Sequence, residues 1–274
     1  MVIAALAACS TGTGYAPAPV PPQAGKPGAA DSTRPEPAPG GIRRWAQSEK
    51  RFIVVQADTL LLRYPQGTQS QVIHRQASLQ VQLRDHASGG MQLTVRLDSL
   101  RAMEIARDSL VIGDGLLWTA DVDPTGRVGT LQPLRPAPLV EQLLRPALAA
   151  LVFPIPADGL RDGATWDDST ASPRRLLTVD VTEHAVMHYS ASGAPGGVSV
   201  LATGALTATG SGAAFGQTLE IAATGQRQQQ FLVKTPGVME SATGRDSLAV
   251  EIAIPAVGQT VPATRIATFQ IGPK

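Results

Sequence analysis

Residues 79–97 read LQVQLRDHASGGMQLTVRL and carry the clearest structural signal in the chain. Apolar Leu, Val and Met alternate with Gln, Thr and Arg on both sides of Ser88-Gly89-Gly90. Alternation with a period of two gives an extended strand one apolar and one polar face. Two such strands joined by a short glycine-containing turn indicate a β-hairpin. The stretch therefore predicts a half-exposed antiparallel sheet.

The same alternation continues along most of the chain after residue 50. It predicts a hairpin around Asp123-Pro124-Thr125-Gly126, where proline and glycine favour a turn. The expected strands are Trp118–Val122, Arg127–Leu131, Leu177–Tyr189, Val198–Thr209, Leu219–Phe231, Val238–Ile254 and Ile266–Ile271. Long antiparallel strands coil, and the small residues of 202–216 favour strong curvature. We expect a mainly β fold: a large curved antiparallel sheet or half-barrel.

One segment, residues 137–153, departs from the β pattern. Leu139, Val140, Leu143 and Leu144 fit one face of a helix. Pro146 removes a backbone hydrogen bond, so the segment predicts one short kinked helical insert or two short helices. Three roles stay open for it: a helix that plugs the core, a lid over an apolar ligand cavity, or a loop that inserts into a membrane surface.

Composition and charge limit the function classes. The chain has 274 residues, a hydrophobic fraction of 43% and a net charge of +1, which excludes a wholly disordered chain and gives no general field for nucleic acid. Prolines crowd residues 10–41, which predicts a disordered tether. Residues 42–274 are expected to form a single β-rich domain.

The amino terminus ends an apolar run in Leu6-Ala7-Ala8-Cys9, and Cys9 is the only cysteine. These four residues resemble the lipobox of bacterial lipoproteins, although no basic region precedes the short apolar run. The resemblance implies a signal peptide over residues 1–9 and acylation of Cys9, which anchors the chain to a membrane. Ser10 in the next position implies sorting to the outer membrane, where the domain would face the periplasm of the cell envelope.

The body of the chain carries a second resemblance. Asp162-Gly163 and Trp166 follow the helical insert and a proline-rich loop, an order that resembles uncharacterised β-rich envelope lipoproteins. The Asp-Gly order is inverted relative to the Gly-Asp-x-Trp phrase of those proteins. The expected architecture is also distantly similar to the lipoprotein-carrier half-barrels, in which a curved sheet and a helical lid hold acyl chains. The resemblance to the uncharacterised envelope lipoproteins implies a curved β-sheet and no known activity.

Residues with chemical potential are few. His184 and His188 have the spacing of a helical zinc pair, but alternation places them on a strand, about 13 Å apart. The acids Asp121, Asp123, Asp167 and Asp168 are read as turn or solvated-loop residues. No nucleophile or phosphate-loop motif is present. We expect no metal site, no cofactor and no enzymatic activity.

These observations favour a non-enzymatic binding or carrier domain for a lipid or another apolar ligand. The residues expected to line or cap its ligand face are Trp118, Leu143, Leu144, Leu151, Phe153 and Trp166. A carrier predicts an apolar cavity of roughly 300 Å3 or more. The alternative, a structural or assembly lipoprotein that docks on envelope proteins, predicts a filled core and an exposed apolar patch. A carboxylate hydrolase, the third hypothesis, predicts that several of the acids converge in one cleft.

Overall fold

A computed structural model describes residues 41–274 apart from 87–88, 103–110, 113–114, 177–178 and 215. Within this part the chain forms a twelve-stranded antiparallel sheet, one α-helix and one turn of 3-10 helix. The elements are β1 (Ser48–Tyr64), β2 (Gly67–Asp85), β3 (Met91–Ala102), β4 (Val111–Ile112), β5 (Leu116–Val122), β6 (Gln132–Pro133), α1 (Pro138–Ala149), β7 (Thr165–Leu176), β8 (Val179–Ala194), β9 (Gly197–Ala214), β10 (Gln217–Lys234), β11 (Val238–Ile254), η1 (Pro255–Val257) and β12 (Gln259–Pro273). The expected signal peptide, Cys9 and almost all of the tether lie outside the described residues.

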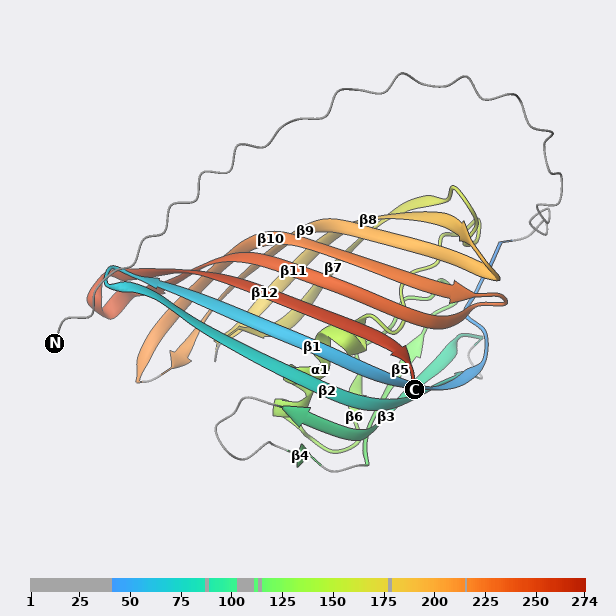
Figure 1. The fold of residues 1–274 in the computed structure, drawn as a ribbon, viewed down its shortest axis with the longest axis horizontal. Coiled ribbons are helices and arrows are strands. Elements are labelled where there is room, and N and C mark those ends of the chain that lie inside the picture. The colour runs from blue at the N-terminus through green and yellow to red at the C-terminus, as the bar shows by residue number, and fades with distance from the viewer. Residues whose placement is uncertain (1–40, 87–88, 103–110, 113–114, 177–178, 215) are drawn as a thin grey trace, which may run out of the picture. The chain divides into compact units, whose positions relative to one another are not determined.

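The strands form two meanders that meet in the middle of the sheet. The order is β6-β5-β3-β2-β1-β12-β11-β10-β9-β8-β7, with β4 paired to β3. Pairing of β1 with β12 joins the first meander to the last strand of the second. The edges β6 and β7 are not paired with each other, so the curved sheet stays open (Figure 1). This confirms the predicted fold class of a large curved antiparallel sheet with one short helix.

The hairpin predicted at residues 79–97 is present as β2 and β3. Leu83 pairs with Leu93 and Val81 pairs with Val95, as the alternation requires. Ser88 lies outside the described residues, whereas Gly89 adopts a φ of 85°, a conformation that favours glycine. The hairpin predicted after Trp118–Val122 is wrong in its second strand. Val128 makes only an isolated bridge to Val122, and the following strand, β6, has two residues.

Side chains alternate between two faces of the sheet, and we call the face that packs against α1 the inner face (Figure 1). In β8 every second residue from Val179 to Ala191 is buried, and those between are exposed or half-buried. Two inner-face glycines allow close strand contact. A Cβ on Gly204 would lie 2.0 Å from the Val186 carbonyl oxygen, and one on Gly225 would lie 1.9 Å from that of Ser247. Glycine at these positions of β9 and β10 therefore permits close approach of the neighbouring strands.

The helix α1 lies within the predicted insert and runs without interruption through Pro146. The alternative of two short helices is therefore wrong. A proline inside a helix costs about 3 kcal/mol, because it removes a hydrogen bond and crowds the preceding turn. Packing offsets this cost: Leu144, Ala147 and Leu148 are buried against the sheet core.

Candidate functional site

The candidate site consists of the inner face and the segment that covers it. We call this the covering segment; it is α1 with the residues that follow it to Phe153. Three of the predicted ligand-face residues, Leu144, Leu151 and Phe153, are buried in the helix and the chain that follows it. Leu143 and Trp166 are partly buried against the same core. Trp118 is fully buried in β5 opposite Val95. It shares the hydrophobic core with the other five residues.

Aromatic rings gather around Phe153. Its ring centroid lies 4.6 Å from that of Phe231, 5.1 Å from Trp45 and 6.4 Å from Trp166. Trp166 in turn stacks on Tyr189 with centroids 5.0 Å apart. Burial raises the pKa of Tyr189 to about 12, and the charge of Asp168 adds to the effect while Arg227 opposes it. Phe153 and Trp166 are thus brought together, inside a packed cluster rather than around an open cavity.

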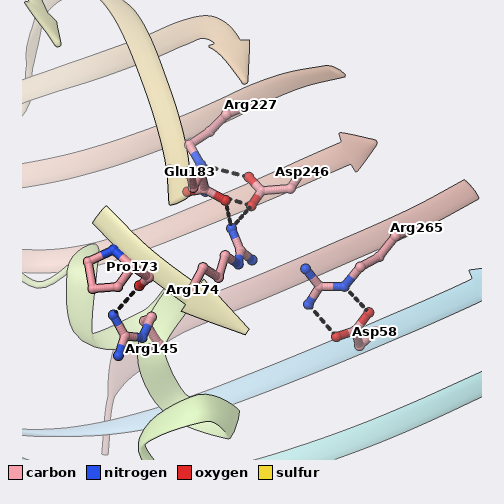
Figure 2. Close-up of polar contacts among 8 residues, drawn as sticks. All are labelled: Asp58, Arg145, Pro173, Arg174, Glu183, Arg227, Asp246 and Arg265. Carbon is pink, nitrogen blue, oxygen red and sulfur yellow. Dashed lines mark hydrogen bonds and ion pairs between the residues drawn. The ribbon is translucent and has the colours of Figure 1, made fainter. Parts of the chain in front are cut away.

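Polar contacts link β7 to the connection after β5 and to α1, and link Trp45 to the end of the covering segment. Arg127, in the connection after β5, donates to the Asp168 carboxylate on β7 over 2.5 Å. Arg145 of α1 donates to the Pro173 carbonyl oxygen, also on β7, over 2.7 Å (Figure 2). Trp45 Nε1 donates to the Phe153 carbonyl oxygen over 3.2 Å. The predicted solvated loop at 167–169 is therefore wrong: these residues belong to β7, and Asp168 is buried.

A charged cluster, buried at Arg174, Glu183 and Asp246 and partly buried elsewhere, occupies the inner face beside α1. It comprises Asp58, Arg75, Arg174, Glu183, Arg227, Asp246 and Arg265, which we call the arginine cluster. Arg227 donates from Nε and Nη2 to the two oxygens of Asp246, each over 2.8 Å. Arg174 pairs with Glu183 and lies 3.5 Å from Asp246. Arg265 donates to both oxygens of Asp58 over 2.9 and 2.5 Å (Figure 2).

Burial and charge act against each other in this cluster. Burial pushes the pKa of the Asp246 carboxyl upward, but the hydrogen bonds and charge of Arg227, with Arg174 and Arg265, bring it below its ordinary value. The pKa of Arg227 is likewise lowered by burial and raised more strongly by Asp246 and Glu183. Both groups are therefore charged at neutral pH.

Sequence reasoning missed the arginine cluster, although a signal was present. Its members stand at positions where the alternation calls for an apolar residue. Glu183 lies between Val181 and Ala185 among the inner-face positions of β8. Asp246 lies two residues before Leu248 among the inner-face positions of β11. A charged residue at a buried position of a strand must be paired, because burial of an isolated charge is very costly.

The four acids singled out from sequence do not form one cleft. Asp121 and Asp167 are exposed, and Asp167 lies 2.7 Å from His188 Nδ1. Asp123 accepts hydrogen bonds from Thr125 and Arg127 within its turn, as predicted. Their separation removes the observation that motivated the hydrolase hypothesis. His184 and His188 both lie on a strand, β8, which confirms that part of the interpretation.

Two hollows on the inner face of the described residues are small. One, of about 20 Å3, is lined by Leu151 and by residues of β1, β2 and β3. The other, of about 10 Å3, lies at the arginine cluster. Neither approaches the volume expected of a preformed lipid cavity. In the part of the chain that the structure describes, no helix is long and apolar enough to cross a membrane.

Comparison with known proteins adds no assignment: no protein-family model matches the chain, and no curated protein matches it in sequence.

Proposed function

We propose that this protein is a lipid-anchored cell-envelope protein that binds a lipid or another apolar ligand on its inner face, which is exposed when α1 moves away. One observation carries the proposal. A single short helix packs its apolar side chains on the inner face of a curved sheet that stays open between β6 and β7. The envelope location and the anchor at Cys9 rest on the resemblance of residues 6–9 to a lipobox.

The small volume of the hollows on the inner face requires that α1 move before a lipid can bind. Ligand pockets usually measure about 300–1,000 Å3, so the small hollows must enlarge before a lipid can enter. The 12-residue helix α1 is too short to be stable alone. Ala137 at its N-cap offers no side-chain acceptor, and Pro146 lacks an N–H. The helix therefore depends on its packing, and an acyl chain can replace the apolar contacts that Val140, Leu144 and Leu148 make.

Among the described residues, the exposed large apolar side chains do not support the docking alternative. Each lies on a different element or connection; they are Val55, Val72, Leu134, Val186, Leu201 and Val257. Scattered single residues of this kind are normal on a protein surface. We therefore prefer the binding function.

Native mass spectrometry tests the binding function. The full chain carrying Cys9→Ser, purified from a bacterial envelope, should retain an acyl ligand or take up added palmitate. Hydrogen exchange should then be faster at the α1 amides and unchanged in the centre of β12, because only the helix moves. A clean unliganded mass with no uptake of palmitate would contradict the function.

The anchor has a separate test. The unmodified chain should sediment with membranes, whereas Cys9→Ser should appear in the soluble periplasmic fraction, because it lacks the acyl chains that make anchoring stable. Ser10→Ala serves as the matched control, since it changes a neighbouring hydroxyl and keeps the thiol. Membrane attachment that survives Cys9→Ser would exclude lipidation at this residue.

A further inference from the structure

Three guanidinium nitrogen atoms in the arginine cluster are buried without a hydrogen-bond acceptor in the described part of the chain. They are Arg75 Nε, Arg174 Nη2 and Arg265 Nη1. More than about 90% of buried polar groups in proteins are paired, and an unpaired one costs about 1–3 kcal/mol, more when charged. Three unpaired donors in one cluster indicate that an acceptor belongs there.

Two of the three arginines, Arg75 and Arg265, line the same hollow. The lining of this 10 Å3 cavity also includes Gln56, Asp58 and Asp246 of the sheet and Pro146 of α1. The Arg75 side chain is 10% exposed, and Gln56 is 4% exposed with its Oε1 also unpaired. A space of this size accepts about one water molecule or a monatomic ion. Figure 2 shows the Arg174 guanidinium paired with Glu183 and Asp246, and the Arg265 guanidinium paired with Asp58.

The charges of the cluster do not cancel. Four arginines face three carboxylates, Asp58, Glu183 and Asp246, so one positive charge is left over. Asp58 is already engaged by both hydrogen bonds from Arg265, and its nearer oxygen lies 4.0 Å from Arg75 Nη1. Burial lowers the pKa of Arg75, and the like charge of Arg265 lowers it further, against the pull of Asp58.

We propose that Gln56, Arg75 and Arg265 form a buried site for one singly charged anionic group. A water molecule could satisfy the donors but would leave the excess charge buried, whereas an anion satisfies the donors and neutralises the charge. A half-turn of the Gln56 amide presents its NH2 as a further donor. Two sources supply such a group: a free ion such as chloride, or the acidic head of an amphiphile on the inner face. The second source rests on the proposed function.

Thermal and urea unfolding of the full Cys9→Ser chain test the site with chloride as the probe. Chloride replaces gluconate at constant ionic strength. Gluconate is too large for the closed cavity, and its hydroxylated chain, unlike an acyl chain, cannot replace the apolar contacts of α1. Above its Kd, each tenfold increase in chloride should raise the folding equilibrium constant about tenfold. Equal stability in chloride and gluconate would overturn the proposal.

Two variants separate a bound anion from a general salt effect. Arg75→Gln removes the excess charge and one unpaired donor, so chloride should no longer affect its stability. Arg245→Gln removes a charge from an exposed position on β11 and should keep the full chloride response. Equal chloride responses in the two variants would overturn the assignment of the site to the arginine cluster.

A measurement on the unaltered inner face does not depend on whether Arg75→Gln folds. Crystals of the Cys9→Ser chain soaked in bromide should show an anomalous peak within hydrogen-bond distance of Arg75 Nε and Arg265 Nη1. A cavity that holds only a water molecule at saturating bromide would overturn the proposal.

Palmitate and hexadecanol distinguish the two sources, since they share a 16-carbon chain and differ in charge. In chloride-free buffer, binding of palmitate alone, weakened by added chloride, would assign the site to the head of an amphiphile. Equal binding of both would assign it to a free ion. If neither binds, the proposed function fails, and the chloride and bromide measurements still decide the anion site.

Discussion

Asp246→Asn is expected to lower the free energy of unfolding at pH 7 by about 3–5 kcal/mol, the usual cost of breaking a buried ion pair from one side. The carboxylate accepts two hydrogen bonds from Arg227 and lies 3.5 Å from Arg174 Nη1. Asparagine keeps the size of the side chain but presents an NH2 to one of these donors and removes the negative charge. Arg227 then has Glu183 as its remaining anionic partner.

The loss should shrink in acid. The folded-state pKa of Asp246 lies below its ordinary value, so its contribution is complete above the unfolded pKa of about 3.9 and is lost as pH falls toward the folded value. The variant has no carboxyl to titrate at this position. Urea unfolding at a series of pH values should therefore show the two stability curves converging below about pH 4.

Asp180→Asn is the matched control for the same chemical change. The Asp180 side chain is 86% exposed and lies 3.8 Å from Arg175. Exposed ion pairs contribute little, so this variant should stay within about 0.5 kcal/mol of the unaltered chain. Equal losses at positions 180 and 246 would mean that the arginine cluster does not stabilise the fold in the way that its contacts indicate.

Alternation made the sheet predictable and also limited what could be predicted. It located β2, β3 and the strands from β8 onward, because a strand with one buried face repeats every two residues. It could not show that β7 passes through Asp168, since two adjacent acids suggest a loop. The strand is instead held by its pairing with β8 and by Arg127.

The contents of the inner face depended on contacts between residues far apart in the chain. Asp58 and Arg265 are separated by 207 positions and meet because β1 pairs with β12. The curvature that brings Arg174 on β7 to Asp246 on β11 is likewise a property of the whole sheet. The sequence shows these residues as charged side chains at positions expected to be buried. It does not show which residues they pair with.

Phe153→Ala should destabilise the protein by about 3–5 kcal/mol, the range for removal of a buried aromatic side chain. The ring is 3% exposed and contacts the rings of Trp45 and Phe231 directly. Its loss leaves a cavity bordered by rigid aromatic groups that cannot collapse fully into the space. The backbone carbonyl that accepts the Trp45 hydrogen bond remains, so the change reports on packing rather than on that bond.

Leu134→Ala is the control, because Leu134 is 66% exposed and its truncation should change stability by less than about 0.5 kcal/mol. Thermal and urea unfolding of both variants measure the difference.

The same two variants also test the proposed displacement of α1. Phe153 packs on Phe231 of the sheet, so its removal loosens the covering segment. Phe153→Ala should therefore bind palmitate more tightly than Leu134→Ala. Equal or weaker binding would mean that the covering segment does not compete with the ligand.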